Sequence, residues 1–370
     1  MNNPLRKGSL RIATVAGIPI WAHFSWLIIF GLITWSLSSH YFPKAAPDLP
    51  VLAYWIKGVL AALLLFGSVV VHELSHSLVA RKFGLGIESI TLFIFGGVAR
   101  MKEDPRHPSA EFWIAIAGPL SSFVLSFLFF VLALNTAGGA RTLFIYLAQI
   151  NLILGIFNLI PGFPMDGGRV LRSAIWRLKG DYFTATLRAS SVGQTIALVI
   201  IFFGFLSIFR GGPGGLWLML IGWFLYSAAQ ASYRQATLQE ILAGVTVEEI
   251  MATDLKTVSP GMSLDQAVNE YFLKYGYGGF PVVEAGKFLG MVTLKEVKNV
   301  PKPDWGRLTI ADVYVPHDQK WEVTRGDDVL RALELMIKED KGRVAVKDKG
   351  RFVGLITRNG IARYVQIKGK

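Results

Sequence analysis

Long stretches without a single acidic or basic residue dominate the first two-thirds of this 370-residue chain. About 20 consecutive apolar residues cross a bilayer, so each stretch is long enough for a transmembrane helix. A further apolar run, 58–71, continues in a helix-compatible pattern to about residue 82. The sequence therefore predicts a multi-pass α-helical membrane protein with about six transmembrane helices. The five uncharged stretches are Ile12–Pro43, Phe112–Ala140, Thr142–Met165, Ala189–Phe209 and Gly211–Tyr233.

The composition agrees with this class and excludes others. Charged residues make up only 17% of the chain, whereas soluble domains contain about 25%. The chain has no cysteine, which excludes disulfide scaffolds, cysteine nucleophiles and thiolate zinc sites. The net charge is +12, but the basic residues stand between the apolar runs. That pattern favours a membrane protein with cytoplasmic loops over a nucleic-acid-binding protein.

The basic residues also predict the orientation in the membrane. Cytoplasmic loops carry an excess of Lys and Arg. We therefore expect a protein of the cell (inner) membrane with both chain termini in the cytoplasm. The basic residues lie before the first span, between the second and third, and between the fourth and fifth: Arg6, Lys7, Arg11; Arg81, Lys82, Arg100, Lys102, Arg106; and Arg169, Arg172, Arg177, Lys179, Arg188.

The second predicted span contains the HExxH pattern His72-Glu73-Leu74-Ser75-His76. Residues four apart on a helix lie on one face, one turn apart, so both imidazoles can bind one metal ion. Glu73 is placed to take a proton from a water that a zinc ion activates. Because ionisable groups at membrane depth are costly and usually functional, the pattern indicates a metal-dependent hydrolase.

A third metal ligand has to come from elsewhere in the chain. Asp166 ends the fourth apolar run and is the only acidic residue between Glu111 and Asp181. Two prolines and three glycines break the helical pattern between Asn158 and Arg169. Non-helical backbone at membrane depth lines a wet cavity or is covered by protein. Alternatively, Asp166 caps the following helix, with Arg169 as its partner. The presence of the HExxH pattern favours the interpretation of Asp166 as a metal ligand.

These two motifs together resemble the site-2 protease family of intramembrane zinc metalloproteases. HELSH in a predicted transmembrane helix is followed by NLIPGFPMDGG in a later one, and the resemblance covers about residues 8–235. It implies that His72, His76 and Asp166 bind one zinc ion per chain. It further implies that Glu73 is the catalytic glutamate and that Asn158 helps to hold the substrate.

Two other segments match the same family. Gly118-Pro119 corresponds to a Gly-Pro near the start of the family's third span, while Met165 stands where the family usually has Leu. The segment Gly86–Met101 is rich in β-branched and aromatic residues and predicts two short strands, or a strand and a loop. The family has a small membrane-associated β segment at this place, whose edge could receive an unwound substrate as an added strand.

The last third of the chain is an internal repeat of soluble composition. Phe288–Thr293 (FLGMVT) recurs as Phe352–Thr357 (FVGLIT), and Thr246–Met251 recurs as Thr309–Tyr314. Each copy predicts a strand, an amphipathic helix, a hairpin and a final helix, and two such copies pack together. The repeat resembles a tandem pair of cystathionine-β-synthase (CBS) domains. We predict a transmembrane metalloprotease domain over 1–240 and CBS domains over 244–303 and 304–370.

In the CBS family a Thr followed three residues later by Asp commonly contacts the ribose of an adenine nucleotide. The matching positions here are Thr293 with Glu296 and Thr357 with Gly360. The sequence therefore leaves three roles for the CBS pair: adenine nucleotide binding, dimerisation or substrate docking. It assigns no nucleotide-binding residue.

The leading hypothesis is an intramembrane zinc metalloendopeptidase that cuts transmembrane or membrane-adjacent segments of membrane proteins. By family analogy its substrate is an anti-sigma factor or a membrane-tethered transcription factor, and the CBS pair regulates activity, docks substrate or forms a homodimer. No nucleic acid is expected as a partner. The alternatives are a CBS-regulated transporter or channel and a non-catalytic zinc-binding scaffold, but the latter needs a fourth ligand that the sequence does not offer.

Overall fold

The structure, a computed structural model, describes residues 8–94, 96–212, 214–318, 321–338 and 341–369. It contains two compact units that divide between Thr237 and Leu238. We call them the helical unit and the C-terminal unit.

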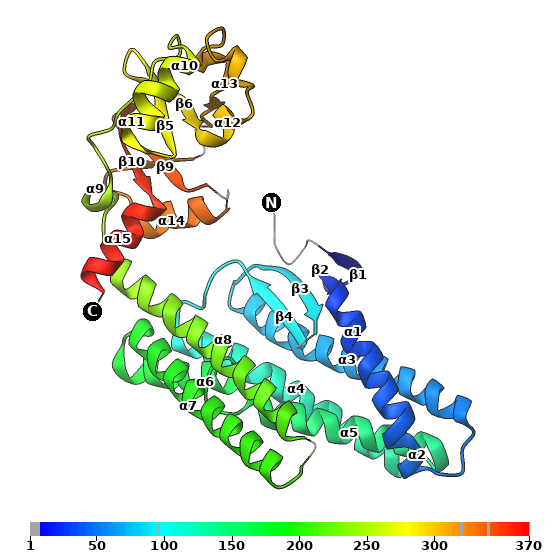
Figure 1. Ribbon diagram of the computed structural model, residues 1–370. Coiled ribbons are helices and arrows are strands. Elements are labelled where there is room, and N and C mark those ends of the chain that lie inside the picture. The colour runs from blue at the N-terminus through cyan, green and yellow to red at the C-terminus, as the bar shows by residue number, and fades with distance from the viewer. Residues whose placement is uncertain (1–7, 95, 213, 319–320, 339–340, 370) are drawn as a thin grey trace. The chain divides into compact units, whose positions relative to one another are not determined.

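Most of the helical unit is formed by long apolar helices that lie side by side (Figure 1). Four described helices are long and apolar enough to cross a membrane, namely α3, α4, α5 and α7. They correspond to the second to fifth predicted spans; the first and sixth contain α1 and α8. The helices are α1 (Phe24–Ser36), α2 (Phe42–Ala45), α3 (Val51–Lys82), α4 (Pro108–Leu134), α5 (Gly138–Asn158), α6 (Asp166–Lys179), α7 (Tyr182–Phe209) and α8 (Gly215–Leu242), with a π-helical segment at Leu37–Tyr41.

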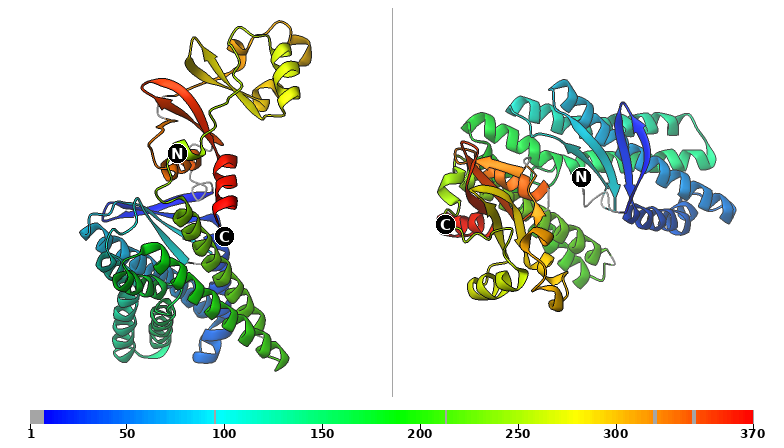
Figure 2. Two further views of the ribbon diagram at one scale, coloured as in Figure 1. Left: turned by 90° about the vertical axis from the view of Figure 1, so that its left-hand side faces the viewer. Right: turned by 90° about the horizontal axis from the view of Figure 1, so that it is seen from above.

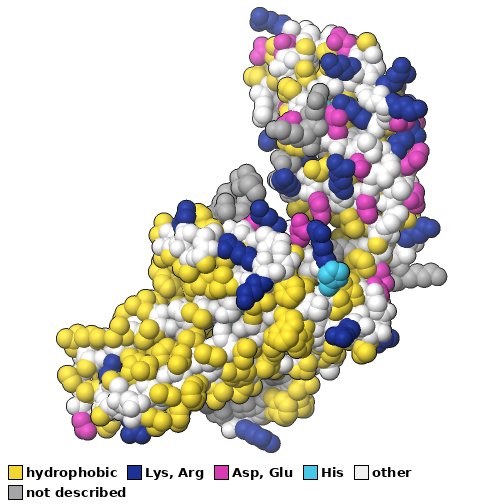
Figure 3. All heavy atoms as spheres, turned by 180° about the vertical axis from the view of Figure 1, so that it is seen from behind, with side chains coloured by type: hydrophobic (Ala, Val, Ile, Leu, Met, Phe, Trp, Pro, Cys, Tyr) yellow, Lys and Arg dark blue, Asp and Glu magenta, His cyan; other side chains and the backbone are white. Residues whose placement is uncertain are grey.

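The helical unit exposes large hydrophobic side chains along its length, as expected of helices that face lipid. Leu128 on α4, Ile153 on α5 and Phe202 on α7 are each about half exposed or more. In Figure 3 hydrophobic side chains cover the visible face of this unit, whereas acidic and basic side chains are interspersed over the visible face of the other. This contrast agrees with a membrane domain followed by a soluble module.

A four-stranded sheet accompanies the helices, in the order β1-β2-β3-β4. The prediction of two short strands in Gly86–Met101 is confirmed by β3 (Ile87–Phe93) and β4 (Gly96–Met101), which pair antiparallel. The hairpin of β1 (Ser9–Val15) and β2 (Ile18–His23) was not predicted, because most of its residues belong to the uncharged run that begins at Ile12 and was predicted as the first span.

The sheet packs against the C-terminal half of α3 (Figure 2). Buried isoleucines of β2 and β3, including Ile20 and Ile90, contact Val70 and Leu74 of α3. Since β4 is the last strand in the order, one of its edges is free of strand pairing within the described sheet. This packing brings β4 beside the part of α3 that carries the HExxH pattern.

The C-terminal unit confirms the predicted repeat. Each copy has a helix before a β-hairpin and another after it, and the equivalent residues Phe288 and Phe352 stack with ring centroids 4.6 Å apart. The sheets are β5-β6-β7, in which β7 is the short strand Val315–Pro316, and β10-β9-β8. The first copy contains α10 (Leu264–Ala267), α11 (Leu273–Tyr275), β5 (Gly279–Glu284), β6 (Lys287–Thr293) and α12 (Leu294–Lys298); the second contains β8 (Glu322–Thr324), α14 (Val329–Lys338), β9 (Arg343–Asp348), β10 (Arg351–Thr357) and α15 (Arg358–Lys368).

The short helix that precedes each copy of the repeat packs in the core of the other copy. Val247, in α9 (Val247–Ile250), is buried in the core that surrounds Met336 of the second copy. Ile310, in α13 (Ile310–Val313), is buried in the core that surrounds Phe280 of the first copy. The recurring Thr246 and Thr309 both form capping boxes at the start of these helices. The two copies therefore share their cores.

Candidate metal centre

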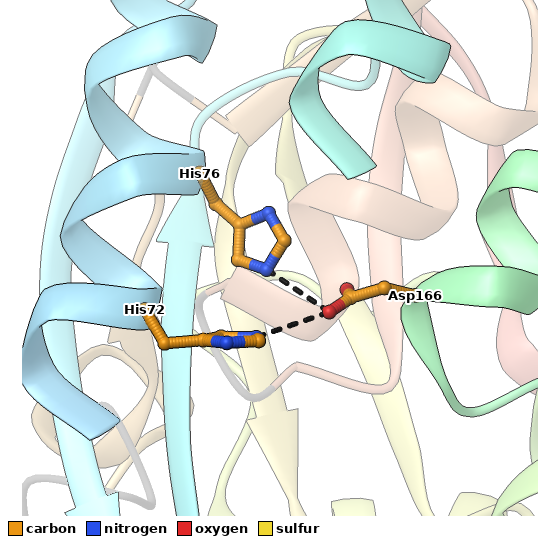
Figure 4. Close-up of side chains that lie close together, drawn as sticks. All are labelled: His72, His76 and Asp166. Carbon is orange, nitrogen blue, oxygen red and sulfur yellow. Dashed lines mark hydrogen bonds and ion pairs between the residues drawn. The ribbon is translucent and has the colours of Figure 1, made fainter. Parts of the chain in front are cut away.

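Two histidines of α3 face one carboxylate at the start of α6 (Figure 4). The Oδ2 atom of Asp166 lies 3.1 Å from Nε2 of His72 and 3.1 Å from Nε2 of His76. The candidate ligand atoms all lie within 4.8 Å of one another. The structure thus brings together three side chains that the sequence had placed in two separate motifs.

The alternative role of Asp166 as a helix cap is wrong. The N-cap of α6 is Met165, and Asp166 is the first residue of the helix itself. Arg169, the partner that this alternative required, donates instead from Nε to Glu111 at 3.3 Å. The carboxylate of Asp166 is therefore directed at the imidazoles.

The neighbouring helix α4 orients both imidazoles. His76 Nδ1 lies 2.6 Å from the carbonyl oxygen of Ile114, and His72 Nδ1 lies 2.9 Å from Ser122 Oγ. Because a carbonyl oxygen only accepts, Nδ1 of His76 donates the proton and Nε2 presents its lone pair. Such outer contacts fix the tautomer and the ring orientation of metal-binding histidines. Ser122 lies one turn after Gly118 on α4, which is the only sequence signal for its role.

Gly118 of α4 leaves the space in which the two imidazoles meet. A Cβ atom at this position would lie 2.2 Å from Nε2 of His76 and 2.6 Å from Nε2 of His72. Real Cβ atoms essentially never approach other atoms so closely. Glycine is therefore required here by close packing against the centre.

A second glycine allows the chain to deliver Asp166. The backbone leaves α5 at Asn158, turns through residues 159–165 and re-enters a helix at Asp166. A Cβ atom at Gly167 would lie 2.3 Å from the carbonyl oxygen of Leu159. The turn can therefore fold back over the first turn of α6 only because this residue is glycine.

Glu73 and Asn158 line one cavity together with the three candidate ligands. Its volume is about 480 Å³, and β4 and α8 complete its walls. The backbone N–H of Ala99 in β4 donates to Oε2 of Glu73 at 3.2 Å. His23 lies elsewhere: its ring accepts from the backbone N–H of Ser25 and caps α1. Ala99 and Arg169 also line this cavity. The sequence did not single out Ala99, and it considered Arg169 only as a basic loop residue and as the partner of a capping Asp166.

The donor set fits a zinc ion. Two imidazole nitrogens and one carboxylate oxygen, with a further position open, are the usual ligands of a catalytic zinc site. Bonds of 2.0–2.1 Å in a tetrahedron place ligand atoms about 3.3 Å apart, close to the 3.1 Å observed here. Within the described residues, no fourth His, Asp or Glu joins the group.

The C-terminal unit has a separate cavity of about 330 Å³ between its two copies, lined by Thr293, Glu296 and Arg343 among others. Glu296 already accepts from the backbone N–H of Thr293 at 3.0 Å in a capping box. Burial lowers the pKa of Arg343, and the charge of Glu296 opposes this shift. At the equivalent place in the second copy, Gly360 donates its backbone N–H to Thr357.

Comparison with known proteins identifies a family for each of the two parts of the chain. The sequence model of peptidase family M50 matches residues 60–138 and 134–204, and that of the CBS domain matches 247–302 and 313–367. A zinc metalloprotease of Methanocaldococcus jannaschii is 33% identical over 97% of this chain and 96% of that protein.

Another relative and one solved structure resemble the chain in the same way. Rip3 of Mycobacterium tuberculosis, which is provisionally named as a zinc metalloprotease, is 33% identical over 98% of this chain and 94% of that protein. The structure of a site-2 protease from Methanocaldococcus jannaschii is 34% identical and covers 61% of this chain and 95% of that one, with a TM-score of 0.42. The chain therefore belongs to peptidase family M50, the zinc metalloproteases of the site-2 protease type, and carries a tandem pair of CBS domains.

Proposed function

We propose that this zinc metalloprotease hydrolyses peptide bonds in transmembrane or membrane-adjacent segments of other membrane proteins, with His72, His76 and Asp166 as the ligands of one zinc ion. The observation that carries the proposal is the convergence of these ligand atoms within 4.8 Å at helices that include membrane-span candidates. Since α3 contributes both histidines and the catalytic glutamate, the chemistry takes place beside a helix that can cross the bilayer.

The side chains around the cavity divide the chemistry among them. A zinc ion at this site supplies Lewis-acid chemistry that activates a water and polarises the scissile carbonyl. Glu73 takes the proton of that water as general base and returns it to the leaving amine. The N–H of Ala99 holds one carboxylate oxygen of Glu73 in place. Asn158, which lines the same cavity, binds the substrate backbone.

The free edge of β4 is the proposed binding site for the unwound substrate. The N–H of Ala99 is directed at Glu73 and hence away from the partner strand β3. Backbone groups of a strand alternate in direction, so those of Gly97 and Met101 share this open side. A substrate segment that adds to β4 as a strand therefore passes beside Glu73. Helix-breaking Gly and Pro in the substrate lower the cost of unwinding it.

Replacing Asp166 by Asn tests the metal site. We expect the zinc content to fall from about one ion per chain to nearly none, because a neutral amide is a far weaker zinc ligand than a carboxylate. Metal analysis of the purified full-length protein, after chelation and re-addition of zinc, measures this.

The matched control is Asp181→Asn. Asp181 caps α7, where Asn is an equally good cap. This variant should keep its zinc, and retention of wild-type zinc affinity by Asp166→Asn would refute the assigned ligand set.

The proposed topology has six membrane crossings, with both chain termini in the cytoplasm of a bacterial or archaeal cell. The proposed biological role is regulated intramembrane proteolysis, in which cleavage releases a membrane-tethered transcription factor or removes an anti-sigma factor. The basic loops of the sequence support the orientation, and membership of the site-2 protease type supports the role.

For the CBS pair we propose adenine nucleotide binding in the cavity between the two copies. Arg343 lines this cavity, and a guanidinium binds phosphate through charge-assisted hydrogen bonds. Replacing Arg343 by Gln is expected to weaken AMP or ATP binding about tenfold or more, measured by calorimetry on the full chain.

The control for this prediction is Arg351→Gln, at the exposed start of β10 and outside the cavity. It should bind AMP and ATP as tightly as the unmodified protein. If the unmodified protein binds neither nucleotide at millimolar concentration, the proposal is wrong and the CBS pair acts through protein contacts.

A further inference from the structure

A fully buried carboxylate lies outside the proposed catalytic set. Glu111, in the first turn of α4, has no exposed surface. Its Oε1 atom accepts from Nε of Arg172 at 3.1 Å, from Nη2 of the same arginine, and from Nε of Arg169 at 3.3 Å. Both arginines belong to α6, so one acidic side chain of α4 binds two basic side chains of the helix that carries Asp166.

Aromatic rings enclose the arginine at the centre of this cluster. The guanidinium carbon of Arg172 lies 4.9 Å from the ring centre of Phe163 and 4.7 Å from that of Tyr182. Phe163 precedes α6 in the turn and Tyr182 begins α7. Removing one partner of a buried ion pair leaves an uncompensated charge, which is strongly unfavourable. The cluster therefore fixes α6 against α4, α7 and the turn.

The same helix α4 orients the two histidines. Ile114 and Ser122 bind their Nδ1 atoms, and Gly118 makes the space between their Nε2 atoms. Hence α4 supplies none of the three candidate ligands but contacts the elements that carry all of them. Asp166 precedes Arg172 by six residues, or about 9 Å along α6. The separation of the carboxylate from the imidazoles thus depends on how α6 is held against α4.

We propose that Glu111, acting through Arg172, is a positioning residue that holds Asp166 at bonding distance from the zinc ion. This inference rests on the proposed metal site. Without the negative charge of Glu111, α6 is no longer fixed and Asp166 moves relative to His72 and His76. Loss of a partner that hydrogen-bonds a ligand directly weakens metal binding about tenfold to hundredfold. Because Glu111 acts on Asp166 through Arg172 and the backbone of α6, we expect an effect at the lower end of this range.

The test is the zinc affinity of Glu111→Gln, measured by competition with a chromophoric chelator on the full-length protein. We expect zinc to bind about tenfold more weakly, the lower end of the range for partners that bond a ligand directly. Proteolysis should be low at limiting zinc and should recover in excess zinc. Substitution of Co²⁺ for zinc should give a changed visible absorption spectrum, because the coordination geometry is altered.

Two further variants separate positioning from stability. Glu111→Gln combined with Arg172→Met removes both charges of the more buried pair and leaves only the more exposed Arg169. Thermal stability should therefore recover in part relative to either single variant, while zinc binding stays weak. Asn151→Ala is the control: Asn151 is fully buried and donates to Ser68 at 3.2 Å between α5 and α3. It should lower thermal stability but change zinc affinity by less than about twofold.

The outcomes distinguish this inference from the site assignment. If Asp166→Asn keeps its zinc, the assigned metal site is wrong. The positioning role is wrong if Asp166→Asn loses zinc while Glu111→Gln binds zinc and gives a Co²⁺ spectrum like the unmodified protein. If Glu111→Gln does not fold, the double variant is used for the same comparison. A loss of stability with unchanged zinc affinity would likewise overturn it.

Discussion

Replacing Glu73 by Gln is expected to abolish peptide-bond hydrolysis while the protein retains its zinc. The glutamine amide has nearly the same shape as the carboxylate, and its oxygen can still accept from the N–H of Ala99. It cannot take a proton from water at neutral pH. Loss of a general base typically lowers the rate by about 10²-fold to 10⁴-fold.

The measurement combines a rate with a metal analysis. Cleavage of transmembrane peptides rich in Gly and Pro is followed in proteoliposomes, and zinc is counted in the same preparation. In cells, comparative proteomics of membranes with the active protein and with Glu73→Gln should show a membrane-tethered fragment that accumulates in the variant.

Ser75 offers a control within the same motif. Its hydroxyl donates to the carbonyl oxygen of Val71 in its own helix and does not line the cavity. Ser75→Ala should therefore cleave peptides at nearly the unmodified rate. Cleavage at the wild-type rate by Glu73→Gln would refute the assigned base, whatever its zinc content.

Local periodicity explains why part of this site could be predicted from the sequence. The spacing of His72 and His76 fixes their relative position on any helix, whatever packs around it. Asp166 is 90 residues further on, and only its isolation among apolar residues and the family motif pointed to it. Its distance from the imidazoles required the structure.

Other features had no usable sequence signal. Most of the hairpin β1–β2 lies in the uncharged run that begins at Ile12, and an apolar run alone does not separate strand from helix. Its turn places both Ala16 and Gly17 at positive φ, which is typical of two-residue hairpin loops. Arg172 was counted among the basic loop residues that set orientation, yet it is only 8% exposed and pairs with Glu111, 61 residues away.

The repeat shows the same division between local and long-range information. Self-similarity between Phe288–Thr293 and Phe352–Thr357 predicted two copies of one unit, and the structure contains them. The exchange of Val247 and Ile310 between the two cores could not be predicted. The apolar character of a residue predicts that it is buried, but it does not predict which copy of the repeat it packs against.

Replacing Gly118 by Ala should remove the metal centre although it makes α4 a better helix. Alanine favours a helix interior over glycine by about 1 kcal/mol. The added methyl group, however, would lie 2.2 Å from Nε2 of His76 and 2.6 Å from Nε2 of His72. The imidazoles cannot retreat without losing their contacts to Ile114 and Ser122. We expect at least about a hundredfold loss of zinc affinity and no detectable proteolysis.

Gly67 of α3 is the matched control, because a Cβ atom there would meet nothing within 4 Å. Gly67→Ala should keep both zinc and activity, and its stability should not fall. Zinc titration and thermal unfolding of the two variants side by side therefore separate helix propensity from crowding of the centre. Full zinc binding and activity in Gly118→Ala would mean that the imidazoles can bind the ion from another direction, and the geometry argued for the centre would then be wrong.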